Sequence, residues 1–186
     1  MTEKTRKTPA YKICLIAFAI CINLIGGQIA LFLKLPIYLD SIGTVFIAAV
    51  LGPFYGMLPN LISGVLMGIT VDIYSLYYAP VGIILGFVTG LIYRKYNPKK
   101  LWILVAALVI TIPSTIASSC ITAFLFGGIT SSGSTILVQL LARTPLGLVG
   151  SCFVVQFITD YIDRVICLYM VVILNKVLKK YLKESL

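Results

Sequence analysis

Lys34-Leu-Pro-Ile-Tyr-Leu-Asp-Ser-Ile-Gly-Thr44 is a short polar stretch that separates two long apolar runs of the chain. Proline restrains the residue before it to extended backbone, so Leu35 and Pro36 are expected to end the first helix. Asp40 and Ser41 carry the side-chain oxygens that favour helix N-termini, and we expect them to cap the second helix. The stretch therefore predicts a tight turn between two apolar helices.

The composition is that of a membrane protein rather than that of a water-soluble domain. The 186 residues are 60% hydrophobic and 11% charged, and their mean hydropathy is +1.05. One crossing of the hydrocarbon needs about 20 apolar residues, so six crossings would use most of the chain. We predict one all-α membrane domain, a six-transmembrane-helix bundle over residues 13–178 with tails at 1–12 and 179–186.

The net charge of +9 is concentrated in three basic clusters. Their members are Lys4, Arg6, Lys7 and Lys12, then Arg94, Lys95, Lys99 and Lys100, then Lys176, Lys179, Lys180 and Lys183. The positive-inside rule places all three clusters, and with them both termini, in the cytoplasm. Termini on one side require an even number of crossings of the plasma membrane. Anionic lipid headgroups suffice as partners for these cations, and we expect no nucleic-acid partner.

The residue types needed for common catalytic and metal sites are scarce. The chain has no histidine, which excludes histidine-ligated metals, Ser-His-Asp hydrolysis and HExxH proteolysis. Its five cysteines lie in apolar runs without CxxC spacing, and glutamate occurs only at Glu3 and Glu184. A general base would therefore have to be an aspartate. We expect no enzyme activity, no metal and no cofactor.

Six spans are predicted, and their breaks come from glycine and proline. The spans are 13–33, 41–51, 54–69, 79–93, 101–126 and 155–178. The second is short for a crossing because Gly52 and Pro53 end it. In the fifth, Pro113 frees a backbone carbonyl, and we expect hydroxyls such as that of Ser118 to satisfy it. A further break is expected at residues 147–151.

Small residues at helical spacing predict close helix packing. The third span carries Gly56, Asn60, Gly64 and Gly68 at intervals of four, and the fourth repeats the spacing with Gly82, Gly86 and Gly90. Residues four apart share one helix face, and small side chains there let two backbones approach closely. We predict a close-packed seam, while Asn60 has the alternative of facing a polar cavity.

The outer connections contain aromatic and polar residues. Asp72 is followed by Tyr74 and two further tyrosines, which are typical interfacial anchors and alternatively contact a ligand. Residues 127–134 are rich in glycine and serine, so they form a flexible loop or a lid. The segment 135–148 carries Gln139 and Arg143, and we interpret it as a re-entrant or interfacial helix on the outer side.

Three ionisable residues are expected inside the sixth span, about 6 to 13 Å below its outer end. They are Asp160, Asp163 and Arg164, and each ionised group in the membrane costs about 2.5 to 3.5 kcal/mol unless it is paired or hydrated. Asp160 and Arg164 are four residues apart and can pair on the helix. Asp163 then remains for Arg143 or for a bound solute. The alternative is a structural ion-pair cluster that locks the fifth and sixth spans together.

The ionisable residues outside the basic clusters all belong to the outer half of this arrangement. They include a slight surplus of aspartates, which favours a neutral or cationic solute in a pocket that opens outward. The residues expected to bind the solute are Tyr38, Asp40, Asn60, Asp72, Tyr74, Gln139, Arg143, Asp160, Asp163 and Arg164. No second ionisable relay follows toward the cytoplasm, which indicates a binding subunit rather than a pump. The alternative is a self-sufficient secondary transporter with Asp160 or Asp163 as its proton or sodium site.

The chain resembles the substrate-binding (S) components of energy-coupling factor (ECF) transporters over nearly its whole length. The resemblance is carried by Leu35-Pro-Ile-Tyr-Leu-Asp-Ser-Ile-Gly-Thr44, Leu51-Gly-Pro-Phe-Tyr-Gly56 and Asp160-Tyr-Ile-Asp-Arg164. It implies a multi-pass membrane protein that captures a vitamin or a nucleobase-like or nucleoside-like micronutrient outside the cell. A transmembrane coupling protein and two cytoplasmic ATPases would complete the transporter. The chain has no GxxxxGK[ST] phosphate loop, so those partners would hydrolyse the ATP.

The resemblance also implies a docking face on the first span and closing loops at the outer end. The nearest match to the family's small-residue docking pair is Ala17 with Cys21, and Ala19 with Asn23 lies beside it. The residues themselves leave a second interpretation open, because Ala19, Asn23 and Gly27 share a face that can pack inside the bundle. By position, the loops that close over the ligand would be 34–39, 72–78 and 127–134.

Overall fold

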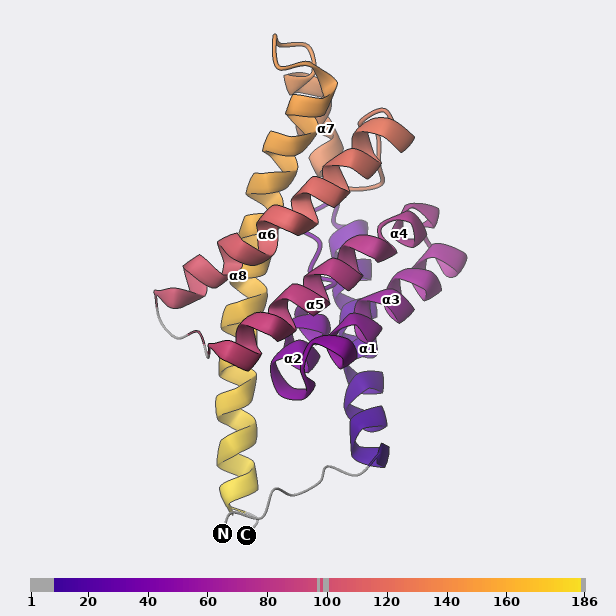
Figure 1. Cartoon of the computed structure of the whole chain (residues 1–186). Helices are drawn as coiled ribbons and strands as arrows, with labels where there is room; N and C mark the ends of the chain where they lie inside the picture. Colours follow the sequence, from indigo (N-terminus) through magenta and orange to yellow (C-terminus); the bar gives the residue numbers. More distant parts are fainter. Residues whose placement is uncertain (1–8, 97, 99–100, 185–186) are drawn as a thin grey trace.

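A computed structural model describes residues 9–96, 98 and 101–184, with the side chains of the last helix described as far as residue 174. Within this part the chain is all-helical and contains no strand (Figure 1). The elements are α1 (Pro9–Phe32), α2 (Ile42–Leu51), α3 (Pro53–Thr70), α4 (Ile73–Tyr77), α5 (Ala79–Lys95), α6 (Trp102–Cys120), the π-helix η1 (Ile121–Leu125), α7 (Ser134–Leu141) and α8 (Gly147–Glu184).

Two stretches of helix are long and apolar enough to cross a membrane by their length and composition. They are α1 and the continuous α6–η1 stretch Trp102–Leu125, each of 24 residues. The apolar helix α2 has ten residues, fewer than a perpendicular crossing needs. These findings agree with a helical protein that associates with a membrane.

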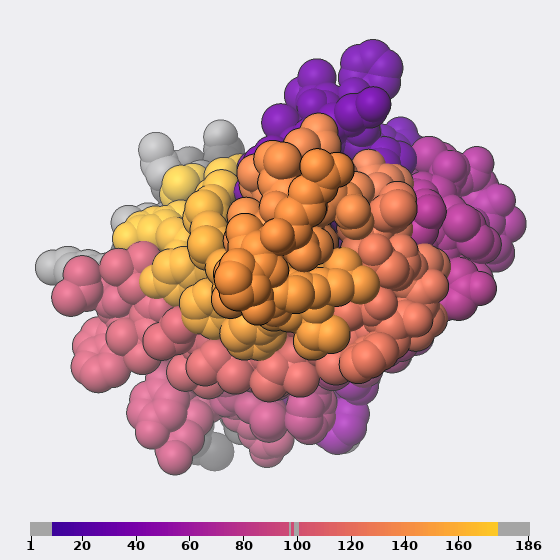
Figure 2. Space-filling view, turned by 90° about the horizontal axis from the view of Figure 1, so that it is seen from above, coloured from indigo at the N-terminus to yellow at the C-terminus, as the bar shows by residue number. Residues whose placement is uncertain are grey.

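The helices pack in chain order, and the first helix begins and the last helix ends on the same side of the molecule. α1 packs on α2, α2 on α3, α3 on α5, α5 on α6 and α6 on α8, while α4 and α7 lie toward the opposite end (Figure 1). The beginning of α1 and the end of α8 extend in the same direction. Seen from above, α7 and the start of α8 cover the centre of the far end (Figure 2). The expectation that both ends lie on one side is consistent with this arrangement.

The turn between α1 and α2 forms where the sequence predicts it, but its capping differs. Ser41 makes no side-chain bond to the N-terminus of α2, because its hydroxyl donates to Asp40 Oδ1 at 2.8 Å. The N–H of Gly43 donates instead to Asn23 Oδ1 of α1, also at 2.8 Å. The predicted local cap is therefore wrong. An amide from another helix satisfies the backbone donor that Asp40 and Ser41 were expected to satisfy.

The predicted small-residue seam is confirmed. A Cβ atom added at Gly86 of α5 would collide with the backbone carbonyl of Gly56 of α3, and one at Gly90 would collide with the backbone of Pro53. Gly82 faces the side chain of Asn60 at similarly close range. Glycine thus allows α3 and α5 to approach backbone to backbone. We call Gly56, Gly82, Gly86 and Gly90 the glycine seam.

The last helix is longer than the sequence suggests. Gly147 adopts a positive φ of 65° and begins α8, so residues 148–151 are its first turn rather than part of a break. The hydroxyl of Ser151 donates to the carbonyl of Gly147 within that turn. Residues 179–184, expected to be a tail, continue the helix. As a result, Asp160 and Arg164 lie about 20 to 25 Å along the axis from the start of α8, deeper than predicted.

The interior contains a large apolar cluster and a smaller one. The large cluster joins α2, α5, α6 and α8 through fully buried side chains such as Ile47, Leu85 and Leu168. The small cluster, with Val138 and Cys152, lies beneath α7. The polar residues predicted to bind a solute lie outside both clusters, so the apolar core holds the helices in place around them.

The described members of the basic clusters lie at the end away from α4 and α7. Lys12 Nζ lies 3.4 Å from the hydroxyl of Tyr55, and Tyr55 and Arg94 line one shallow hollow. Lys95 belongs with Arg94 to the last turn of α5. The other members of the first two clusters, Lys4, Arg6, Lys7, Lys99 and Lys100, lie outside the described residues, as do the side chains of the last four lysines.

Candidate functional site

A cavity of about 120 Å³ lies between α1, α3, α6, α8 and the connection formed by residues 33–41. Polar and charged residues line much of it, together with the tyrosines that precede α5. These residues are Asn23, Tyr38, Asp40, Ser41, Asn60, Ser63, Asp72, Tyr74, Ser75, Tyr78, Ser118, Thr130, Ser131, Ser132, Asp160 and Arg164. We call this space the central cavity. Segments that are far apart in sequence therefore meet around one enclosed polar space.

Asp160 is held in the wall of the central cavity by hydroxyl groups of α6. Its Oδ2 atom accepts hydrogen bonds from Thr115 at 2.7 Å and from Ser118 at 3.4 Å. The predicted pairing with Arg164 is absent, because α6 supplies the donors across the helix interface. Ser118 also donates to Gln156 Oε1 and to the carbonyl of Thr115 in its own helix. The hydroxyls of α6 thus fix a buried carboxylate.

Arg164 pairs with its neighbour in sequence. Its Nη1 atom lies 2.5 Å from Asp163 Oδ2, and the two side chains are 5% and 0% exposed. Asp163 Oδ1 accepts the backbone N–H of Leu39 at 2.9 Å, and Leu39 has a positive φ of 53°. Asp163 therefore ties α8 to the connection between α1 and α2. It stands behind Arg164 rather than in the cavity wall.

The guanidinium of Arg164 is incompletely satisfied. Among the described residues, its Nε atom is buried without a hydrogen-bond partner although the side chain lines the central cavity. A buried donor without a partner costs about 1 to 3 kcal/mol, so such groups in native proteins call for a bound water or ligand. Arg164 thus offers the cavity a donor that an acceptor on a solute can use.

Asp40 approaches from the connection between α1 and α2, outside the helices. Its backbone carbonyl accepts Asn60 Nδ2 at 3.3 Å, and its Oδ1 accepts the Ser41 hydroxyl. Burial raises the pKa of the Asp40 carboxyl above its ordinary value, and the charge of Asp163 raises that pKa further. Asn60, positioned on the glycine seam, therefore also fixes the chain that carries Asp40.

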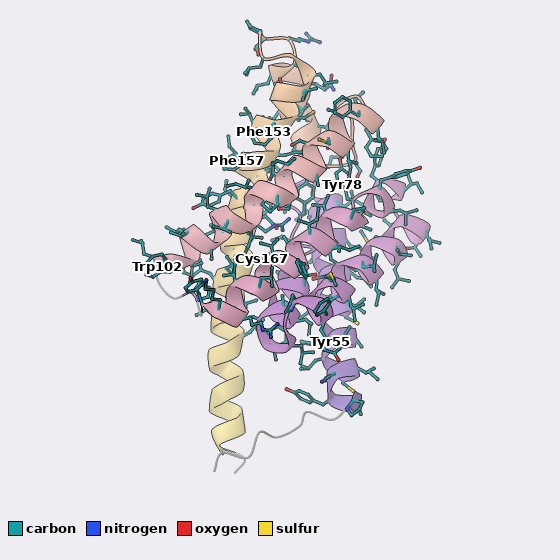
Figure 3. The ribbon with its side chains drawn as sticks, viewed as in Figure 1. Tyr55, Tyr78, Trp102, Phe153, Phe157 and Cys167 are labelled. Atoms are coloured by element: carbon teal, nitrogen blue, oxygen red, sulfur yellow. The ribbon has the colours of Figure 1, made fainter. Side chains whose placement is uncertain are left out.

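The outer side of the central cavity is bounded by α4 and the 127–134 loop. Asp72 Oδ2 accepts hydrogen bonds from Ser75 at 3.3 Å and from Ser131 at 2.8 Å. The ring of Tyr74 packs edge-on against Phe126, with centroids 4.7 Å apart. Tyr78 is hydrogen-bonded to Thr122 and lies in the upper half of the bundle (Figure 3). Two of the loops expected to border a ligand are thus joined to each other.

The structure brings together seven of the ten predicted solute contacts. The residues that line the central cavity are Tyr38, Asp40, Asn60, Asp72, Tyr74, Asp160 and Arg164. Gln139 is not among them, and its amide donates to the carbonyl of Gly127. Arg143 is exposed and does not approach Asp163, because α8 is longer than predicted and carries Asp163 deeper into the bundle. Both residues therefore lie outside the lining of the central cavity, and their contact with a solute stays a prediction.

Other cavity residues were assigned elsewhere or overlooked. Asn23 was considered for a docking face, yet it lines the cavity and caps α2. Ser63 lies on the cavity face of α3, three residues after Asn60, and is 4% exposed. Because residues three apart share a helix face, the spacing of Ser63 from Asn60 could have predicted that both line the cavity. Ser132 belongs to the 127–134 loop, which was expected to close over a ligand although no single residue in it was singled out.

The two docking pairs on α1 have opposite environments. Ala19 and Asn23 are 0% and 1% exposed, and a Cβ added at Gly43 of α2 would collide with the backbone of Ala19. That face is used inside the molecule. Ala17 and Cys21 are exposed. A partner protein can therefore reach Ala17 and Cys21 but not Ala19 and Asn23.

The described residues hold no group of three or more acidic or cysteine side chains placed to bind a metal ion. The arrangement suits the binding of a small organic molecule, because acceptors, donors and aromatic rings face one enclosed space. Comparison with protein-family models, with curated proteins and with solved structures gave no match.

Proposed function

We propose that this chain is the solute-capture subunit of an ATP-driven ECF-type importer in the plasma membrane. Its six spans would be α1, α2, α3, α5, α6–η1 and α8, with both termini in the cytoplasm. A transmembrane coupling protein and two ATPases would deliver the solute, a vitamin or a nucleobase-like or nucleoside-like micronutrient. The resemblance of the motifs around Asp40, Gly52 and Asp160 to that family supports the proposal.

The observation that carries the proposal is the asymmetry between the two ends of the bundle. Asp40, Asp160 and Arg164 line a cavity at the end that bears α4 and the connecting loops. Toward the other end, α2, α5, α6 and α8 are joined by an apolar cluster. A site that opens to one side, with no described aspartate beyond Asp163 toward the other, would bind a solute and depend on partners to release it across the membrane.

Ligand-dependent stabilisation of the purified full chain tests the proposal. Vitamins, nucleobases and nucleosides are screened one by one in detergent, because a ligand that binds only the folded state raises the melting temperature. The chain is also co-expressed with the coupling protein and ATPases of its host and isolated through a tag on the coupling protein. A ligand that stabilises the chain, together with co-isolation, is expected. Failure of both would refute the proposal.

A matched pair of variants locates any binding. Ser63 lines the central cavity and makes only a 3.3 Å bond to its own helix, whereas Ile62 beside it is exposed. Ser63→Leu fills cavity space and should abolish stabilisation by the ligand. Ile62→Phe adds bulk on the outside and should leave the stabilisation intact. Equal effects of the two variants would place the ligand elsewhere.

A second candidate, a self-sufficient secondary transporter, is favoured by one feature of the site. Asp160 is a carboxylate deep in a helix with hydroxyl partners and without a paired cation among the described residues, as in many ion-coupled carriers. Uptake into proteoliposomes that contain this chain alone, driven by a proton or sodium gradient, would establish this function. Absence of uptake without the ATPases would leave the importer subunit.

A further inference from the structure

We propose that the central cavity selects a small organic monocation, bound between the carboxylates of Asp40 and Asp160. Arg164 would contribute a hydrogen bond through Nε, while its charge is held by Asp163. This inference rests on the proposed solute-capture function, and it adds the charge and approximate size of the solute. It follows from three features of the cavity: its charge balance, its free acceptor atoms and its volume.

The charge balance leaves three cavity-lining carboxylates, those of Asp40, Asp72 and Asp160, without a salt bridge among the described residues. Asp163 and Arg164 form the one salt bridge among the described residues, at 2.5 Å. Asp40 and Asp160 line the cavity, and the hydroxyls that contact their side chains carry no charge. Ionised groups in a low-dielectric interior are unfavourable without a counter-charge. A cationic solute between them would supply that charge, and an anionic solute would add to the repulsion.

The free acceptor atoms require a solute that donates hydrogen bonds. Asp160 uses Oδ2 for both of its contacts with α6, and Oδ1 has no partner among the described residues. Asp40 Oδ1 accepts the Ser41 hydroxyl, and no other described side chain donates to the Asp40 carboxylate. An ionised carboxylate can only accept hydrogen bonds, so the complementary group is an N–H or O–H donor. Ammonium and amidinium groups meet both requirements because they are charged donors.

The size and walls of the cavity restrict the rest of the solute. Its volume of about 120 Å³ is near that of the engineered 150 Å³ cavity that accepts benzene, so a single ring fits. Tyr38, Tyr74 and Tyr78 line the space, and aromatic faces attract cations as well as flat rings. The unpartnered Nε of Arg164 favours an acceptor atom on the same solute. These features together describe an amine-bearing or amidine-bearing heterocycle.

Three single-ring probes of similar shape and different charge test the selection. Benzamidine is a cation, benzamide is neutral and benzoate is an anion at neutral pH. Each is titrated onto the purified full chain by calorimetry in detergent, at matched ionic strength. We expect benzamidine to bind at least about tenfold more tightly than benzamide, and benzoate to show no binding. Equal or tighter binding of benzamide or benzoate, or no binding of benzamidine, would overturn the proposal.

Two variants that each remove one charge locate the cation. Asp160→Asn removes the inner carboxylate and should reduce benzamidine affinity by about tenfold or more while leaving benzamide affinity nearly unchanged. Lys34→Met removes a charge at an exposed residue that does not line the cavity, and should change benzamidine affinity by less than about threefold. Changes of equal size in both variants would show that only the general field of the protein acts, and would overturn the assignment to Asp160.

The micronutrient screen separates failure of this inference from failure of the proposed function. If a neutral or anionic micronutrient binds in the cavity, the capture function stands and the selection of a cation is wrong. If every ligand that binds is cationic and Asp160→Asn weakens it, both stand. If no compound binds and the coupling protein does not co-isolate, both are wrong.

Discussion

The glycine seam and the central cavity adjoin along the same helix, α3, and meet at Asn60, but they are built by different means. In the seam, Gly56 and Gly86 bring two backbones together without any polar side chain. In the cavity, Asn60 and Ser63 of α3 face carboxylates from other parts of the chain. The seam depends on the small size of its residues, whereas the cavity depends on which distant groups meet. Changes in the two regions should therefore have different signatures.

The largest expected effect is the loss of Asp163. Asp163→Ala would leave Arg164 buried without its counter-charge and Leu39 N–H without its acceptor, so we expect a loss of about 3–5 kcal/mol in the free energy of unfolding. Unfolding of the full chain in mixed detergent micelles, followed by circular dichroism, measures this loss.

A double variant provides the control for this prediction. Asp163→Leu with Arg164→Met removes both charges and should recover much of the stability, because apolar pairs often replace buried ion pairs without loss. A loss below about 1 kcal/mol in Asp163→Ala would mean that the pair does not hold α8 to the α1–α2 connection.

Part of this comparison could be predicted from the sequence, and part could not. The glycine seam could be predicted from the residue spacing within each helix alone. Intervals of four place Gly56 and Asn60 on one face of the helix whatever surrounds them. The partners of Asp160 are not local, since Thr115 lies 45 residues before it. Helical spacing suggested a pair with Arg164, but the choice between α6 hydroxyls and Arg164 depends on how two helices rotate against each other.

The length of α8 shows a second limit of sequence-based prediction. Two glycines and a serine between residues 147 and 151 suggested a break, whereas the structure needs only the positive φ of Gly147 to begin the helix. This difference of about two helical turns separates Asp163 from Arg143, so the predicted contact between them does not form. An error in the predicted start of a helix shifts the predicted position of every ionisable residue along it, and so changes which of these residues are predicted to contact each other.

In the glycine seam, Gly86→Ala should destabilise the protein by about 1–3 kcal/mol, because the added Cβ would collide with the Gly56 carbonyl and overpack the helix interface. The effect should not depend on ligand or on salt. Gly150→Ala is the control, since a Cβ there has only the Leu146 side chain within 4 Å, at 3.6 Å or more. Equal stability of the two variants, measured by thermal unfolding, would show that α3 and α5 are not in backbone contact.

Asn23 both caps α2 and lines the central cavity. Asn23→Ala should destabilise the protein by about 1–2 kcal/mol. The variant removes the acceptor for Gly43 N–H and the donor to Thr44 Oγ1, at 2.8 and 2.9 Å. Gln28→Ala, on an exposed part of the same helix, should change stability by less than about 0.5 kcal/mol. A similar small loss in Asn23→Ala would contradict its role as the cap of α2.

The smallest expected effect is that of Ser131→Ala, which removes the 2.8 Å bond between the 127–134 loop and Asp72. Both residues are partly exposed, so the unfolding free energy should fall by less than about 0.5 kcal/mol. If the loop retains bound solute, the dissociation rate should nevertheless increase by a few fold, because opening the outer side no longer breaks that bond. Thr135→Val, which removes the bonds of Thr135 to Thr130 and none to Asp72, is the control. Stopped-flow dissociation separates the two variants, and equal rates would mean that the contact between the loop and Asp72 does not control exit from the cavity.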